Sequence, residues 1–254
     1  MTPPPPPPSH PKILFVGDSI SAYANISVLA DATQSDIVTA KAYSAVYDDV
    51  NNKAKKAAHF PKKNFLQVVP NEVVKDSFDH LIIQSGSVDI SNLNTEVNPT
   101  EYIDYFKQET VLSAKNIFNS GLLALEHQPS LKSIVIMKQT PRYDPHDKDP
   151  LSLKPALSQL FNNTITELWI NFPMKEKIYI GSHNIECSGA VQSARYRHTK
   201  TGRFDGVHHY GSSGSKTYTL SVLNILRSAG LISSDHDYHL SCAQYQYQHR
   251  NQGN

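Results

Sequence analysis

Cysteine, tryptophan and long apolar runs are scarce in this chain of 254 residues. Its two cysteines, Cys187 and Cys242, are too few to build a disulfide framework. No stretch has the length and apolarity of a membrane span, so none is expected. The 24 basic and 23 acidic residues leave a formal net charge of +1. This balance gives no electrostatic reason to expect nucleic acid or an anionic membrane as the main ligand.

The first residues lack the charged and apolar regions of a secretory signal, and we therefore expect an intracellular, cytoplasmic protein. Six consecutive prolines at residues 3–8 predict a stiff polyproline leader over residues 1–11, outside the fold. A plain linker is the favoured interpretation of this leader, and a ligand for an SH3 or WW partner is the alternative. The polar residues 233–254 predict a poorly ordered tail, which leaves residues 12–232 for the folded domain.

Short apolar runs rich in β-branched residues alternate with longer helical patterns from Lys12 onward. The runs predict five strands, at Ile13–Val16, Ile37–Ala40, His80–Gln84, Ser133–Lys138 and Lys177–Ile180. Helical patterns cover residues 24–33, 99–126, 151–171 and 213–228. This alternation predicts an α/β fold, in which helices cover both faces of a parallel sheet.

Two short motifs near opposite ends of the sequence contain the residue types of nucleophilic catalysis. Gly17-Asp18-Ser19-Ile20 follows the first predicted strand, so Ser19 lies at the sheet edge where ligands bind. Asp205-Gly206-Val207-His208 precedes the last predicted helix. Taken alone, Ser19 could cap a helix, and Asp205 and His208 could be ordinary loop residues. Their joint occurrence favours a serine–histidine–aspartate site.

The two motifs resemble the first and last blocks of the SGNH (GDSL-type) hydrolase superfamily, and the resemblance extends over residues 12–230. It implies a three-layer α/β/α, flavodoxin-like sandwich around a central, mainly parallel five-stranded sheet. It also implies hydrolysis of a small acyl ester without a metal or other cofactor. In this family pattern Ser19 is the nucleophile, His208 the general base and then acid, and Asp205 fixes the imidazole tautomer. His209 is the competing base, but it falls where the family usually has proline.

The middle blocks depart from the family pattern at the oxyanion hole. A family glycine after the second strand is replaced by Ala45, whose backbone N–H can still donate together with that of Ser19. The family's Gly-x-Asn-Asp after the third strand reads Gly86-Ser87-Val88-Asp89, and valine cannot donate. Losing one oxyanion donor costs about 2.7–4 kcal/mol of transition-state stabilisation. Asn92 or Asn94 is a candidate replacement.

Arg142 follows the fourth predicted strand, on the same rim as Ser19, and is a candidate substrate-binding residue. The favoured interpretation of Arg142 taken alone, however, is an ion pair with Asp144 or Asp147 in a proline-containing loop. The cluster formed by His236, His239 and Cys242 has the residue types of zinc ligands but no matching second pair, so we expect no metal.

The sequence thus favours a serine esterase that forms an acyl-serine intermediate. The leading alternative is a catalytically weak or inactive SGNH-fold binding module, of the kind that can form part of a larger protein of the mobile-element type. Val88, which replaces a family oxyanion donor, and the proline-rich leader are the features that favour this alternative. A flavodoxin-like ligand binder is a third option. It is disfavoured because no phosphate-cradling glycine loop follows the first strand.

Overall fold

A computed structural model of the chain describes residues 10–43, 64–84, 87–93, 99–140, 153–183 and 211–232. Within them, five strands form one sheet: β1 (Lys12–Gly17), β2 (Asp36–Lys41), β3 (His80–Gln84), β4 (Ser133–Met137) and β5 (Ile178–Gly181). The strand order is β2-β1-β3-β4-β5, and every neighbouring pair is parallel. This is the flavodoxin-like order, so the predicted fold class is confirmed.

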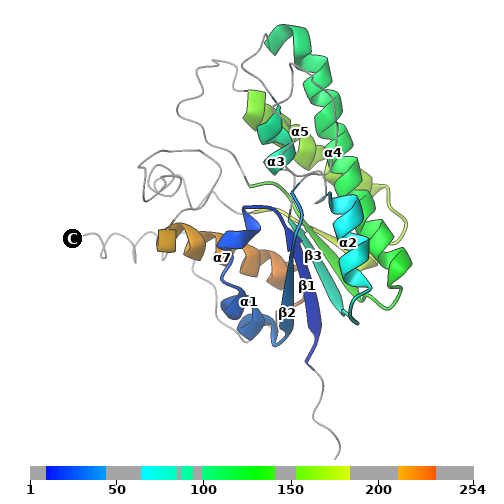
Figure 1. Cartoon of the computed structure of the whole chain (residues 1–254), viewed down its shortest axis with the longest axis vertical. Helices are drawn as coiled ribbons and strands as arrows, with labels where there is room; N and C mark the ends of the chain where they lie inside the picture. The colour runs from blue at the N-terminus through cyan, green and yellow to red at the C-terminus, as the bar shows by residue number, and fades with distance from the viewer. Residues whose placement is uncertain are drawn as a thin grey trace, which may run out of the picture.

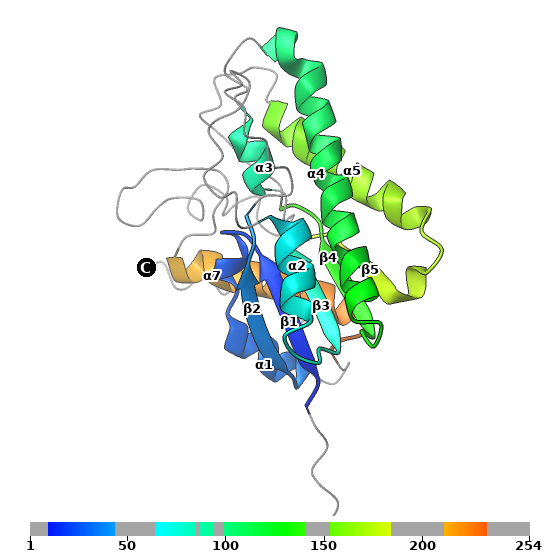
Figure 2. The ribbon, with the colours of Figure 1, turned by 45° about the vertical axis from the view of Figure 1, so that its right-hand side comes forward.

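Helices cover both faces of the sheet (Figure 1). One face carries α1 (Ile26–Thr33) and α7 (Gly211–Ser228), and the other carries α2 (Phe65–Val73), α4 (Pro99–His127) and α5 (Leu153–Ile170). The short helix α3 (Ser87–Asn92) lies beside α5 beyond the sheet edge, next to the N-terminal part of α4 (Figure 2). The molecule is therefore a three-layer α/β/α sandwich.

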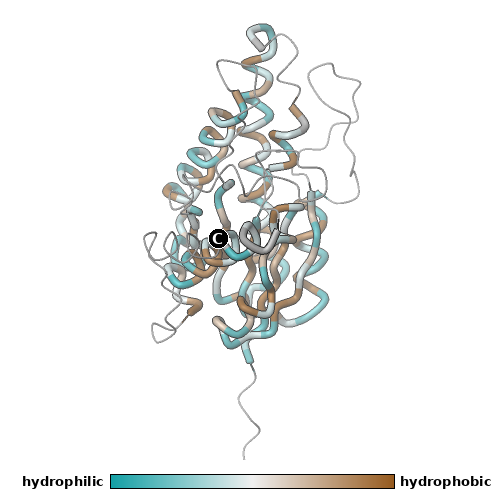
Figure 3. Tube along the Cα trace, turned by 90° about the vertical axis from the view of Figure 1, so that its left-hand side faces the viewer, coloured by the Kyte–Doolittle hydropathy of each residue, from teal (hydrophilic) through white to brown (hydrophobic). Residues whose placement is uncertain are grey.

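Strand side chains alternate between two cores. Leu14 and Val16 of β1 join the core under α2, α4 and α5, whereas Ile13 and Phe15 join the core under α1 and α7. This alternation follows from the two-residue period of a strand, and it places apolar residues on both faces. Each helix carries a mixture of apolar and polar residues along its length (Figure 3), as expected when only one side of it faces the sheet.

All five predicted strands and all four predicted helices occur, and no boundary differs from its prediction by more than two residues. Helices α2 and α3 were not predicted from the sequence. In α2 the interior residue Pro70 lacks an N–H and weakens the helical pattern, but Asn64 caps the helix: its Oδ1 accepts the N–H of Leu66 at 2.8 Å.

The part of the chain that the structure describes contains no helix suited in length and apolarity to crossing a bilayer. Pro11, near the end of the predicted leader, accepts a backbone hydrogen bond from Asp36 at 2.9 Å. Residues 1–9 and the predicted tail 233–254 lie outside the described residues.

Candidate functional site

Ser19 lies in a tight turn at the carboxyl edge of the sheet, two residues past the end of β1. The Oγ of Ser21 donates to the backbone oxygen of Asp18 at 2.8 Å, which closes the turn around Ser19. Gly17 permits this closure, because a Cβ at that position would overlap the Ser21 side chain. Gly17 before Ser19 and Ser21 after it therefore both contribute to the shape of the turn.

The buried carboxylate of Asp18 braces the same turn. Its Oδ1 accepts the backbone N–H of Ile20 at 2.9 Å, and its Oδ2 accepts the hydroxyl of Ser87. Asp18 is 1% exposed, so these hydrogen bonds stabilise a charge that has left water. The peptide on the C-terminal side of Ser19 is thereby fixed to the start of α3.

The block that departs from the family pattern connects several elements. Ser87 opens α3 and donates to Asp18, as described above, while the Oδ2 of Asp89 accepts the hydroxyl of Ser113 on α4 at 2.8 Å. Val88 lies between these two anchors and is half-buried. Its side chain is a hydrocarbon, so it supplies no hydrogen-bond donor at this position.

A second set of buried polar side chains occupies the same edge of the sheet. Gln84 ends β3 beside Gly17, and its Oε1 accepts the hydroxyl of Tyr218 at 3.1 Å. The Nε2 of His183 lies 2.6 Å from the same oxygen, and its Nδ1 lies 2.8 Å from the Oγ of Ser221. The His183 and Tyr218 rings stack with centroids 5.4 Å apart. These side chains are all at least nine-tenths buried.

Electrostatics couple this set to the turn that carries Ser19. Burial, and secondarily the negative charge of Asp18, raise the pKa of Tyr218 well above its usual value. The phenol is therefore protonated at physiological pH and able to donate to Gln84. This set was not predicted from the sequence, because Tyr218 falls within a predicted helix and Gln84 at the end of a predicted strand. The one signal of this buried polar set in the sequence was Gln84, a polar residue at the end of an apolar run.

Helix α7 is attached to the segment that follows Ser19. The Oγ of Ser215 donates to the backbone oxygen of Tyr23 at 2.7 Å, and the Oγ1 of Thr219 accepts the N–H of Asn25 at 2.9 Å. Segments almost two hundred positions apart in the sequence therefore meet at this edge. The motif predicted to supply the base and the carboxylate directly precedes this helix.

Of the predicted site residues, only Ser19 is described together with its side chain. Asn92 lies in α3, but its side chain is outside the described part. The other candidates lie outside the described residues: Ala45, Asn94, Arg142, Asp205, His208 and His209. Over the described ranges, no group of three or more His, Cys, Asp and Glu residues is arranged to hold a metal ion. The cluster of His236, His239 and Cys242 is also outside them.

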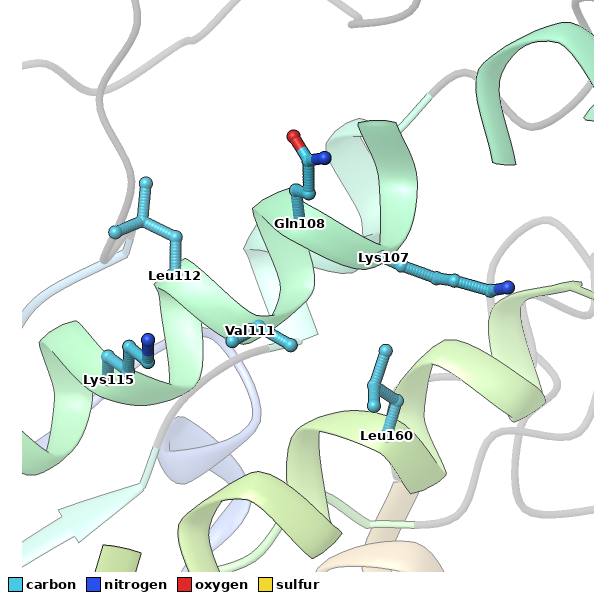
Figure 4. A pocket seen from close by; sticks show the side chains of 6 residues that line it. All are labelled: Lys107, Gln108, Val111, Leu112, Lys115 and Leu160. Carbon is cyan, nitrogen blue, oxygen red and sulfur yellow. The ribbon is translucent and has the colours of Figure 1, made fainter. Parts of the chain in front are cut away.

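A separate groove of about 410 Å³ lies between α4 and α5 (Figure 4). In Figure 4, Leu160 points from α5 toward α4, whereas Gln108 and Leu112 of α4 point away from α5. The groove is lined by Lys107, Gln108, Val111, Leu112, Lys115 and Leu160. It shares no residue with the turn of Ser19 or with the buried polar set.

Comparisons with known proteins concern the fold. No protein-family model and no curated protein matches the sequence. Among solved structures, the salicylyl-acyltransferase SsfX3 of a tetracycline biosynthetic pathway aligns with a TM-score of 0.53 and 14% identity, over 89% of this chain and 56% of that one.

An acetyl-xylooligosaccharide esterase from Geobacillus stearothermophilus aligns in two variant forms. The TM-scores are 0.52 and 0.51, at 15% and 14% identity. The alignments cover 92% and 86% of this chain, and 98% and 94% of the esterase. Together with the strand order, these likenesses show that the chain has the SGNH hydrolase fold.

Proposed function

We propose that this protein is a serine hydrolase that cleaves a small acyl ester through an acyl-serine intermediate. Ser19 is the nucleophile, His208 the general base and acid, and Asp205 the group that orients the imidazole. The observation that carries the proposal is the braced turn of Ser19 at the carboxyl edge of a parallel sheet. Ligands of open α/β sheets bind at this edge.

The turn provides the rigidity that nucleophilic catalysis requires. Asp18 and Ser21 fix the backbone on either side of Ser19, while the Ser19 side chain itself is only half-buried. A reacting group that is held in place before substrate arrives loses little entropy in the transition state. This combination distinguishes Ser19 from a serine that merely caps a helix.

The attachment of α7 supports His208 as the partner of Ser19. Three peptide units separate His208 from Gly211, where α7 begins, and an extended chain spans at most about 3.6 Å per residue. The first turns of α7 are themselves bonded to Tyr23 and Asn25, a few residues after Ser19. The chain therefore has the reach to bring the imidazole to the serine.

In the proposed reaction, the Oγ of Ser19 attacks the ester carbonyl while His208 takes the hydroxyl proton. His208 returns that proton to the departing alcohol, and the acyl group remains on Ser19. Water then attacks the acyl-serine while His208 takes one of its protons. The bond between the acyl group and the Oγ of Ser19 breaks, His208 returns the proton to that oxygen, and the carboxylic acid is released. The backbone N–H groups of Ser19 and Ala45 hold the oxyanion, with Asn92 as a candidate third donor, and Arg142 contacts the substrate.

Turnover of p-nitrophenyl acetate tests the proposal. The solved esterase of this fold acts, by its name, on acetyl-xylooligosaccharides, which makes an acetyl ester the natural first probe. We expect turnover by the wild type and its loss in Ser19→Ala. Ser27→Ala is the matched control, because Ser27 is exposed on α1 and its Oγ donates to the nearby Asn25 side chain at 2.8 Å. Equal rates for the wild type and Ser19→Ala would contradict the proposal.

A catalytically weak or inactive binding module of the same fold is the second candidate function. The specific observation in its favour is Val88, a hydrocarbon side chain where the family places an amide donor. Under this alternative the Ser19 turn persists as part of the fold, and substitution of Ser19 does not change the background rate.

A further inference from the structure

His183 stands at the junction between the sheet and the segment proposed to carry the base. It lies two residues past the end of β5, and residues 184–210, which include Asp205 and His208, separate it from α7. Its Nδ1 lies 2.8 Å from the Oγ of Ser221 on α7, and its ring stacks on that of Tyr218. One buried side chain therefore joins the residues just before that segment to the helix that follows it.

The other nitrogen of His183 joins this junction to the centre of the sheet. Its Nε2 lies 2.6 Å from the Oε1 of Gln84, and an amide oxygen can only accept. His183 therefore donates through Nε2–H, and its Nδ1 can accept the hydroxyl hydrogen of Ser221. A neutral imidazole with its proton on Nε2 satisfies both contacts. Gln84 is fully buried and pairs with Gly17, the residue before the Asp18–Ser19 turn.

Tyr218 extends the same connection toward the nucleophile. Its hydroxyl donates to Gln84, which pairs with Gly17 immediately before Asp18, and the negative charge of Asp18 adds to the rise in the pKa of Tyr218 that burial causes. Asp18 in turn holds the N–H of Ile20. The ends of β3 and β5, helix α7 and the nucleophile turn thus meet in one buried polar set.

We propose that His183 is a positioning residue: its two hydrogen bonds clamp α7 and the end of β5 to Gln84, and so fix where His208 and Asp205 stand relative to Ser19. This inference rests on the proposed function, because the clamp acts on the triad and does not contact the substrate. It goes beyond that function by assigning a role in the chemistry to a histidine outside the triad.

A second histidine that contacts a serine allows a matched test. His80, at the opposite edge of the sheet, is half-buried and has its Nδ1 2.8 Å from a serine hydroxyl, that of Ser133. His183→Phe retains a ring against Tyr218 but removes the contacts with Gln84 and Ser221, and His80→Phe removes the contact with Ser133, far from Ser19. If His183 only stabilised the fold, His183→Phe and His80→Phe would react with the active-site label at similar rates at temperatures where both variants are folded.

The measurement is the second-order rate of labelling by a fluorophosphonate between pH 5 and 9. We expect at least a tenfold lower rate in His183→Phe and a shifted apparent pKa of the labelling reaction, because the triad histidine is displaced. His80→Phe should label within twofold of the wild type with an unchanged pH profile. His183→Gln, which can donate and accept, should recover part of the loss. If His183→Phe does not fold, Ser221→Ala removes only the Nδ1 partner and serves in its place.

Labelling of His183→Phe at the wild-type rate, with the wild-type pH profile, would overturn the positioning role while leaving the proposed function intact. Absence of labelling in the wild type would overturn both. Amide hydrogen exchange gives a readout that is independent of activity. His183→Phe should accelerate amide exchange in α7 and at the end of β3. Unchanged exchange in both elements would contradict the proposal that His183 holds them together.

Discussion

Val88 is the residue at which the chain departs most clearly from the pattern of active SGNH hydrolases. It lies between Ser87, which donates to Asp18, and Asp89, which accepts from Ser113. Both neighbours are therefore fixed, so a side chain introduced at position 88 starts from a defined backbone. Under the proposed function, an amide missing at this position removes one donor from the oxyanion hole, while the hydrogen bonds of the Ser19 turn do not involve the Val88 side chain.

Restoring the amide tests this interpretation. Val88→Asn should raise kcat for p-nitrophenyl acetate by up to about a hundredfold, because one oxyanion donor is worth about 10²–10³ in rate. KM should change little, since the donor acts mainly on the transition state. Val88→Asp, which has nearly the same shape but no N–H, is the control and should give no gain. A fall in kcat for Val88→Asn would show that another group already fills this position.

At the scale of elements, the packing of α7 on β5 decides whether the two ends of the sequence meet. A Cβ at Gly181 would overlap the side chain of Ile225, which is buried and has little room to move. Gly181→Ala should therefore lower the free energy of unfolding by about 1–3 kcal/mol, the usual cost of overpacking. Urea denaturation measures this change.

Gly121 in α4 provides the matched control. A Cβ there would meet Ile134 and Ile136 at 3.6 Å, an ordinary contact distance. Since alanine is the better helix former, Gly121→Ala should raise the free energy of unfolding by about 0.5–1 kcal/mol. Equal effects of the two substitutions would mean that α7 does not approach β5 as closely as described.

The elements differ in how well the sequence predicts them. The five strands were predictable because each is a short apolar run rich in β-branched residues. The central strands β1, β3 and β4 are in addition almost wholly buried, as their continuous apolar runs indicate. Helix α2 was not, since Pro70 lies in its interior, and α3 was not, since it has only six residues and a polar composition. Neither helix has a periodic apolar stripe long enough to be recognised from the sequence.

For the site, the position of Ser19 at the end of β1 was predictable from the glycine-containing turn after an apolar run. The roles of Gln84, His183 and Tyr218 were not. Whether a polar residue near a strand end is buried depends on which helix covers it, and that is a property of the tertiary arrangement. The predicted triad partners remain a prediction, because Asp205 and His208 lie outside the described residues.

At the scale of the whole molecule, the two edges of the sheet differ in chemistry. The carboxyl edge holds the Ser19 turn and the buried polar set, whereas the opposite edge holds Asp79, His80 and Lys132. Burial lowers the pKa of His80 below the 6.5 of an unfolded chain, and the hydrogen bond from Lys132 lowers the pKa of Asp79 below its usual 3.8. Each group binds protons more readily in the unfolded state, so each reduces stability as the pH falls.

The His80 contribution is therefore fully present above pH 6.5 and decreases as the pH falls toward the lower folded pKa. The Asp79 contribution is lost only below about pH 4. His80→Gln should remove the loss of stability that protonation of His80 causes. The difference in unfolding free energy between the wild type and this variant should therefore shrink from pH 8 to pH 5. Urea denaturation at several pH values checks this, and a constant difference would contradict a depressed pKa of His80.

The most direct measurement for the account as a whole is the mass of each peptide after the intact protein reacts with a fluorophosphonate. The braced turn and the attached α7 predict one phosphonyl adduct, on the hydroxyl of Ser19, which His208→Ala abolishes. No adduct, an adduct on a different residue, or an unchanged adduct on Ser19 in His208→Ala would contradict a catalytic serine activated by that histidine.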